Sequence, residues 1–296
     1  MSTVYFAKFN INEEIYNVYN DELLLEKLLF KIYNGIKPNN ILADQDGTYK
    51  FISIDKNPDT SVVSGRLVLF APGVHVSYDE DNDDVIERHD PKAARYITFS
   101  FDIRREIIGF VPKRGFSRNL FLEKFKNLIE ASCDIGEVEL FIEINKRKFV
   151  EQLSVFKHVK EVSIKLIPPN GDKEDFAELF GTSSEKIKET NSTKFELNLK
   201  GTAKQGIDVR SDYIKKFIEF VTKGYGLMNF KGKNTSDEDT QVKSDEQAPF
   251  TKPISDQSKD VIPTVQEKTR AGISEILLQR VSDEGANHNV RENRDE

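Results

Sequence analysis

Apolar positions in the first 116 residues follow the spacing of one helix and several strands. Between Glu22 and Tyr33 every third or fourth residue is apolar, and Asp21 is a suitable N-cap, so we predict a helix there. Residues 95–104 alternate polar and apolar side chains, which is typical of a half-buried strand. Further strands are predicted at 4–11, 49–54, 62–70 and 106–111, the last as the hairpin partner of 95–104.

From Ser117 the pattern changes to alternating helices and strands. An order of this kind places helices on one face of a sheet, as in ferredoxin-like units. We therefore predict an α+β body with a mixed sheet and helices mainly on one face. Its β-rich part is 1–116, and its alternating part, 117–230, packs against the first. Helices are predicted at 117–132, 149–156, 173–189 and 208–223, and strands at 138–144, 159–167, 194–199 and 225–230.

Residues 231–296 contain few apolar side chains and many polar ones, so burial cannot offset the entropy of ordering them. This pattern predicts a disordered C-terminal tail. One segment differs, because residues 266–281 place Ile273, Ile276, Leu277 and Val281 on one helical face. Either this short helix docks on a protein partner or it frays without one.

Composition narrows the class of protein. The chain has 296 residues, of which 38% are hydrophobic, which is enough for a core. It contains no run of 18 apolar residues and no signal-peptide pattern, so we expect a cytoplasmic protein without direct membrane insertion. Cys133, the single cysteine, is interpreted as a buried apolar residue at a helix end rather than as a nucleophile.

Residues for catalysis or metal binding do not form a recognisable pattern. The four histidines are scattered, and no glycine-rich phosphate loop is present. The acidic run 79–84 lacks the glycine of a calcium loop, so a solvated loop is favoured over weak metal binding. We therefore expect no catalytic residues, no metal site and no cofactor. The alternative is a metal-dependent nuclease that uses Glu139, Glu143 and Lys146 along one strand.

Positive charge is concentrated in one segment, although the formal net charge is −7. Residues 103–126 hold seven Lys and Arg against two Glu, a local net of +5. If the strands 95–104 and 106–111 pair, we expect their charged ends to converge on a phosphate-binding corner at a helix N-terminus. A second basic run at a strand-to-helix junction could extend it. The predicted nucleic-acid-binding residues are Arg104, Arg105, Lys113, Arg114, Arg118, Lys146, Arg147 and Lys148.

Three short motifs, in order along the chain, resemble an uncharacterised bacterial family known only as a domain of unknown function. They are Phe101–Arg105 followed by Ile107–Phe110, then Leu166–Asp172 after a strand, and Lys223–Gly226 before the polar tail. The order of Ile108–Phe110 and Leu153–Phe156 is also faintly similar to the RexA phage-exclusion family. That similarity implies a dimeric, DNA-binding cytoplasmic sensor that works with a membrane effector, and it supplies no catalytic residues.

Together the basic segment and the resemblance favour a non-enzymatic nucleic-acid-binding sensor in a bacterial antiphage or phage-exclusion system. DNA is the expected partner, and contacts through phosphates predict binding that weakens steeply with salt. Two alternatives remain open at this point: the nuclease named above, and an interaction scaffold that recruits a protein through the tail helix. A homodimer is also compatible with the sequence.

Overall fold

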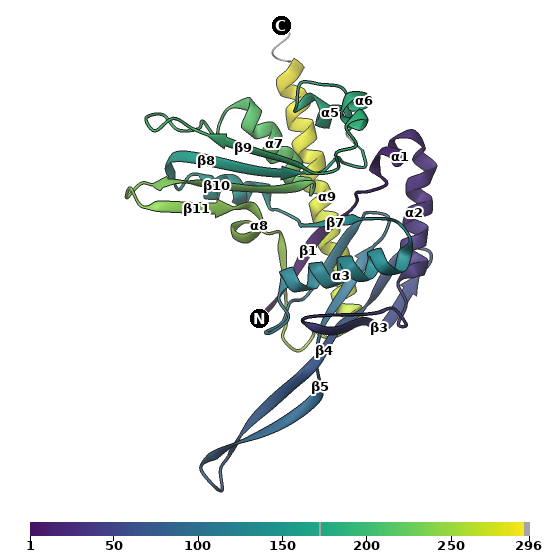
Figure 1. Ribbon diagram of the computed structural model, residues 1–296. Helices are drawn as coiled ribbons and strands as arrows, with labels where there is room; N and C mark the ends of the chain where they lie inside the picture. Colours follow the sequence, from purple (N-terminus) through teal and green to yellow (C-terminus); the bar gives the residue numbers. More distant parts are fainter. Residues whose placement is uncertain (172, 293–296) are drawn as a thin grey trace.

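Two antiparallel sheets organise the chain (Figure 1). The computed structural model describes residues 1–171 and 173–292. The first sheet has the order β12-β1-β6-β5-β4-β3-β2, and β7 pairs with β1 beside β12. Its strands are β1 (Ser2–Ile11), β2 (Ile41–Asp44), β3 (Gly47–Asn57), β4 (Val62–Asp79), β5 (Asp84–Asp102), β6 (Ile107–Phe110), β7 (Val138–Ile142) and β12 (Thr251–Ile254).

The second sheet has the order β11-β10-β8-β9. Helices α4, α5 and α7 contribute to the apolar cluster on one of its faces, together with residues of α1. Its elements are α1 (Ile15–Asn20), α4 (Lys146–Leu153), β8 (Phe156–Leu166), α5 (Lys173–Glu178), α6 (Ser184–Glu189), β9 (Phe195–Lys200), α7 (Asp212–Thr222), β10 (Gly226–Asn234), β11 (Asp239–Lys243) and α8 (Ser244–Gln247).

Helices cover both faces of the first sheet. On one face α2 (Glu22–Gly35) and α3 (Arg118–Cys133) enclose a cluster rich in phenylalanine, in which Phe110 stacks on Phe121 with ring centroids 4.3 Å apart. On the other face α9 (Ile262–Glu292) packs on a smaller cluster that includes Val4 and Phe6. The strand β1 is therefore buried from both sides, unlike an ordinary strand with one solvated face.

The predicted α+β class is confirmed, and two predicted helices, α2 and α3, begin within one residue of the predicted position. Asp21 caps α2 by accepting a hydrogen bond from the Leu23 amide, and Ser117 caps α3 by accepting one from Leu120. The sheets differ from the prediction because the strand pairs among the described residues are all antiparallel, so neither sheet is mixed there. The predicted helix at 173–189 is divided into α5 and α6, and between them Gly181 adopts a positive φ of 64°.

The largest correction concerns the predicted disordered tail. Residues 231–292 contain the end of β10, then β11, α8, β12 and α9, while the last four residues lie outside the described part. Sparse apolar residues are enough here because they sit at well-spaced positions and fill gaps in cores built by earlier segments. Those that become buried are Val242, Ala248, Phe250, Ile254, Val265, Ile273 and Ile276.

The predicted helix at 266–281 lies within α9, and its apolar face packs against its own chain. Close contact is possible because a glycine lies on each side of the interface, Gly109 on β6 and Gly272 on α9 itself. A side chain at Gly109 of β6 would overlap Thr269, and one at Gly272 would overlap the ring of Phe6. The face that we expected to bind a partner or fray is thus part of the fold, although Leu278 and Val281 remain exposed.

The second correction concerns length. The strands β4 and β5 were expected to end near Pro72 and to begin near Arg95, but both continue as a long hairpin that extends away from the body (Figure 1). The pairing shifts register between Ala71 and Gly73, so Pro72 falls at an irregularity where its missing N–H breaks no ladder. We call residues 73–90 the arm.

Candidate functional site

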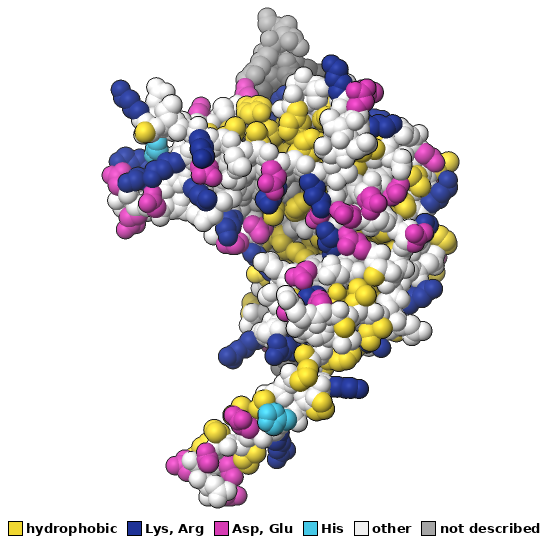
Figure 2. Space-filling model, in the orientation of Figure 1, with side chains coloured by type: hydrophobic (Ala, Val, Ile, Leu, Met, Phe, Trp, Pro, Cys, Tyr) yellow, Lys and Arg dark blue, Asp and Glu magenta, His cyan; other side chains and the backbone are white. Residues whose placement is uncertain are grey.

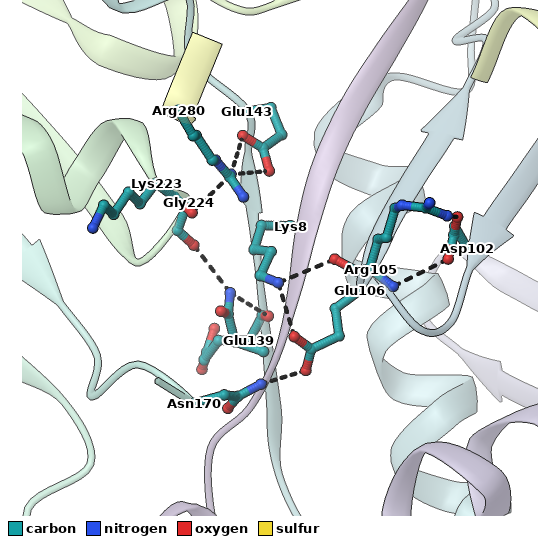
Figure 3. Close-up of polar contacts among 11 residues, drawn as sticks. Lys8, Asp102, Arg105, Glu106, Glu139, Glu143, Asn170, Lys223, Gly224 and Arg280 are labelled. Atoms are coloured by element: carbon teal, nitrogen blue, oxygen red, sulfur yellow. Dashed lines mark hydrogen bonds and ion pairs between the residues drawn. The ribbon is translucent and has the colours of Figure 1, made fainter. Parts of the chain in front are cut away.

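A buried charged cluster lies where the two sheets meet (Figure 3). The Lys8 ammonium on β1 donates hydrogen bonds to Glu106 Oε2 at 2.8 Å and to the Arg105 carbonyl at 3.1 Å. Asn170, in the loop after β8, donates to the other oxygen of Glu106. The Glu106 side chain is thereby held between the first sheet and a loop of the second. Alternation explains why Lys8 is inside, because it follows Val4 and Phe6 on the face that α9 covers.

Arg280 of α9 closes the same region. Its guanidinium donates to both carboxylate oxygens of Glu143 at 2.7 and 2.8 Å and to the Lys223 carbonyl at 2.9 Å. Glu143 is 1% exposed, so this pair is shielded from solvent on the carboxylate side. Arg280 lies on the same inward face of α9 as Val265 and Thr269. Its bonds to Glu143 therefore hold this part of the helix against the body.

The chemistry of this cluster is that of a closed ion pair network. Burial disfavours the charge on Lys8, but the nearby Glu106 carboxylate and Tyr225 together outweigh it and raise the pKa of Lys8 above its usual value. The amine stays protonated at neutral pH and cannot act as a nucleophile or general base. Two cations face two carboxylates, so the cluster is neutral and joins β1, α9 and the second sheet.

A second charged group is equally self-contained. Lys124 of α3 is 1% exposed, and its ammonium lies 2.7 Å from Asp44, 2.5 Å from Asp46 and 2.9 Å from Glu123. These three carboxylates are close enough together to hold a metal ion. Desolvation opposes the charge on Lys124, but hydrogen bonds to the carboxylates raise its pKa above the usual value. The lysine ammonium thus supplies the positive charge that a metal ion would bring. Its contacts with Asp44 and Asp46 also hold α3 against the β2–β3 turn.

The structure does not bring the predicted basic residues of segment 103–126 into one corner. The strands β5 and β6 do pair as a hairpin, with Asp102 opposite Ile107 and Phe99 opposite Phe110. Pairing in this sense puts Arg104 and Arg105 in the turn at one end of β6, while Lys113 and Arg114 follow its other end. The strand between them separates the two groups, so the expected convergence does not occur.

Several of these cations also have partners. Arg105 contacts Asp102 at 2.7 Å, Lys113 contacts Asp260, and Arg118 donates to the Asp245 carbonyl at 2.8 Å. Arg147 pairs with Glu151 on the exposed surface of α4. Arg104, Arg114 and Lys148 are exposed, and Lys146 is partly buried at the start of α4. Their assignment to nucleic-acid binding stays a prediction.

The residues of the nuclease alternative are engaged in ion pairs. Glu139 on β7 contacts Lys126 at 2.9 Å and Lys194 at 3.0 Å, and Glu143 holds Arg280. A carboxylate that already neutralises a cation is a poor ligand for a second one. This arrangement gives the nuclease alternative no support. Lys146, its third residue, is not on a strand but is the first residue of α4.

The second sheet has a face that no buried side chain occupies, and we call it the open face. Along β8, β9 and β10 the side chains alternate, with Val162, Ile164 and Leu166 pointing into the core under α7. Their neighbours point away and are exposed or half-buried. The register aligns these outward residues across all four strands. They are Glu161, Ser163, Lys165, Glu196, Asn198, Lys200, Leu227, Asn229, Lys231, Lys233, Asp239, Gln241 and Lys243.

Five lysines and several amides make this face a polar surface with a small positive excess over its three carboxylates. Its ion pairs are exposed: Lys165 with Glu196 at 2.8 Å, and Lys231 with Glu161 at 3.9 Å. Within the part of the chain that the structure describes, Lys200 forms no ion pair with a carboxylate, whereas Lys233 is close enough to Asp237 and Asp239 to interact with their charges. Exposed pairs of this kind contribute little, about 0–1 kcal/mol, and can be exchanged for a phosphate.

Comparison with protein families shows which family the chain belongs to. Residues 2–264 match the model described as Domain of unknown function (DUF4747). The chain belongs to the DUF4747 family. The match spans both sheets and the first residues of α9, and so extends well beyond the three motifs that carry the resemblance, which lie between Phe101 and Gly226. No curated protein matches the chain, and the comparisons add no support for a likeness to RexA.

Two groups of residues in this DUF4747 chain were not singled out in the sequence. Lys8, Glu106 and Arg280 lie on a strand, in a turn and on a helix that are far apart along the chain, so no local pattern indicates that they contribute to one cluster. The open face could have been found, because β8 and β9 alternate polar with apolar residues. No described helix is long and apolar enough to cross a membrane.

Proposed function

We propose that this DUF4747 protein is a non-enzymatic nucleic-acid-binding protein, and that the open face of its second sheet contacts the phosphate backbone. The observation that carries the proposal is the row of outward lysines on four adjacent strands, Lys165, Lys200, Lys231, Lys233 and Lys243. Lysine and amide side chains are among the groups that contact phosphate and sugar oxygens.

The shape of the face favours backbone contacts over base recognition. Neighbouring strands in a sheet are about 4.8 Å apart, so lysines on adjacent strands can follow a chain of phosphates. The outward residues include no aromatic side chain, so the stacking that anchors bases in many single-strand binders is absent from this face. Binding should therefore depend on salt and show little preference among sequences.

The segment 103–126 remains a second candidate surface. Arg104 and Arg114 are exposed, and neither is held by a carboxylate among the described residues. They lie beyond opposite ends of β6 and so would contact phosphates separately rather than as one corner. The experiment below assigns the contact to one surface or the other.

Fluorescence polarisation with a labelled mixed-sequence DNA, as a duplex and as its single strand, tests the proposal at low and then rising salt. The wild type should bind, with an affinity that falls linearly in a plot of log K against log salt. The variant Lys165→Gln/Lys200→Gln/Lys231→Gln should bind more weakly, and for the single strand its salt slope should be smaller by about 2, since three phosphate contacts are lost.

The matched control removes the same charge elsewhere, with Lys27→Gln/Lys31→Gln/Lys186→Gln on exposed helix positions. It should bind like the wild type. No binding by the wild type at low salt would contradict the function itself. If instead Arg104→Gln/Arg114→Gln abolishes binding and the lysine variant does not, nucleic-acid binding stands but the open face is the wrong surface.

The role as a sensor in a bacterial antiphage system is part of this proposal and rests on the resemblance described above. It predicts that expression of the wild type together with its neighbouring genes lowers phage plating, and that the triple lysine variant loses this protection. Equal protection by the wild type and the variant would separate the antiphage role from nucleic-acid binding.

A further inference from the structure

The arm carries an apolar stripe that the rest of the described chain leaves exposed. Cross-strand pairing places Val74, Val76 and Tyr78 of β4 on one face together with Val85 of β5. These four side chains are 47%, 61%, 62% and 58% exposed. Glu87 and His89 share the face on the β5 side, so the stripe follows β4. Figure 2 shows apolar side chains along the arm where it projects from the body.

Charge is divided sharply between the two ends of the arm. The turn at its tip, residues 79–84, contains five carboxylates and no cation. Asp79, Asp83 and Asp84 shape the turn, since Asp79 accepts from the Asp81 amide and from Asn82, Asp84 accepts from the Val85 amide, and Asp83 accepts from the Tyr78 hydroxyl. The side chains of Glu80 and Asp81 point to solvent and are not used within the turn.

The base of the arm carries more cations than carboxylates, although Asp90, which pairs with Gly73, also lies there. Lys92 and Arg95 follow the arm on β5 and are exposed. Arg95 donates to the Gly115 carbonyl at 3.0 Å, which brings the exposed Arg114 next to it. Six residues of strand separate Gly73 at the base from Asp79 at the tip, about 20 Å at 3.3 Å per residue. The acidic tip therefore cannot reach the basic base of its own arm.

We propose that the arm binds a second copy of this chain, with two arms packed antiparallel across a two-fold axis. In this arrangement the stripe on β4 covers the same stripe of the partner, and each acidic tip meets the basic base of the other arm. A two-fold contact uses one self-complementary surface twice, which is the commonest design of homodimers. Such a dimer would bury the exposed apolar stripe of each arm and pair its acidic tip with the cations at the base of the other arm.

Reversing the charges in pairs tests this arrangement in solution. Sedimentation velocity over a concentration series should show a dimer for the wild type. The tip variant Glu80→Lys/Asp81→Lys and the base variant Lys92→Glu/Arg95→Glu should each raise the dimer Kd at least about tenfold, because like charges then face each other. The control Glu26→Lys/Asp59→Lys carries the same charge change on exposed positions away from the arm and should dimerise like the wild type.

Mixing the two variants makes the test specific. In a two-fold dimer of one tip variant and one base variant, the reversed tip faces the reversed base, and the unchanged base faces the unchanged tip. Both contacts become attractive, so the mixture should regain the dimer that each variant alone has lost. Circular dichroism of each variant checks that the exposed substitutions leave the fold intact.

Replacing residues 74–89 with a short turn between the paired Gly73 and Asp90 removes the stripe and the tip together and should give a monomer. A monomeric wild type at every concentration would overturn the proposal, as would a dimer that survives this shortening. A dimer that is lost by shortening but is not restored by mixing would also overturn the two-fold arrangement. The outcome is independent of nucleic-acid binding, which the shortened chain should retain.

Discussion

The two sheets of this protein are buried to different extents. Helices lie on both faces of the first, so its strand β1 has seven buried residues among the eight from Val4 to Ile11, including Lys8 and Asn10. The second sheet is covered on one side only, and β9 alternates half-buried and exposed residues along its whole length. The first sheet is built as a scaffold, and the second offers a surface.

The comparison also explains where charges are found. A charged residue on a doubly covered strand must have a partner, because an isolated buried charge is very costly. Lys8 accordingly has Glu106, and Glu143 has Arg280. On the open face water solvates the lysines, so their pairing with carboxylates is weak and replaceable. Polar residues thus hold the first region together, while in the second they remain available for a ligand.

The largest expected effect comes from breaking the buried pair. Glu143→Ala leaves Arg280 without its carboxylate, and we expect the free energy of unfolding to fall by about 3–5 kcal/mol. Urea denaturation measures this change. Adding Arg280→Ala should recover part of the loss, since no uncompensated charge then remains. The exposed pair of α4 is the control, and Glu151→Ala should cost at most about 1 kcal/mol. Equal losses at the two sites would contradict the difference in burial.

A neighbouring pair of residues on β8 sharpens the contrast within one sheet. Ile164 is 1% exposed and faces the core, whereas Lys165 points to the open face. Ile164→Ala should lower the free energy of unfolding by about 2–5 kcal/mol. Lys165→Ala should change it by no more than about 0.5 kcal/mol. Similar values for both variants, measured by thermal and chemical denaturation, would mean that the second sheet is covered on both faces.

The smallest expected effect tests whether the core between the first sheet and helices α2 and α3, which contains Cys133, is closed to solvent. Burial raises the pKa of the Cys133 thiol to about 12, so almost no thiolate forms at pH 8. The native protein should react with a thiol reagent such as DTNB far more slowly than the urea-unfolded chain, as followed by absorbance. Immediate stoichiometric labelling of the native protein would show that this part of the core opens readily.

Local signals predicted the elements with strong periodicity. The helices α2 and α3 and the strand β7 have regular apolar spacing, and the caps at Asp21 and Ser117 mark where the two helices start. Cys133 is buried, as its position at a helix end indicated. In these segments local preference and tertiary packing favour the same structure, which is why the sequence alone is informative.

Long-range packing decided the rest. The helix α9 is polar on average, and its few inward residues become meaningful only against a sheet face formed more than 150 residues earlier in the chain. Pro72 and Gly73 usually end a strand, yet β4 continues past them into the arm, with a register shift between Ala71 and Gly73. Arg104 and Arg114 are separated because one precedes and the other follows the four-residue strand β6 of the β5–β6 hairpin. The spacing of charges along the sequence does not reveal at which end of a strand each side chain will lie.

Lysine footprinting tests the central claim, that the open face of the second sheet is the contact surface, without altering the protein. Brief acetylation with and without DNA at low salt, followed by peptide mass spectrometry, reports the accessibility of each lysine. DNA should protect Lys165, Lys200 and Lys231 and leave Lys27, Lys31 and Lys186 labelled as before. Unchanged labelling of the open face, under conditions where polarisation shows the DNA to be bound, would contradict the account.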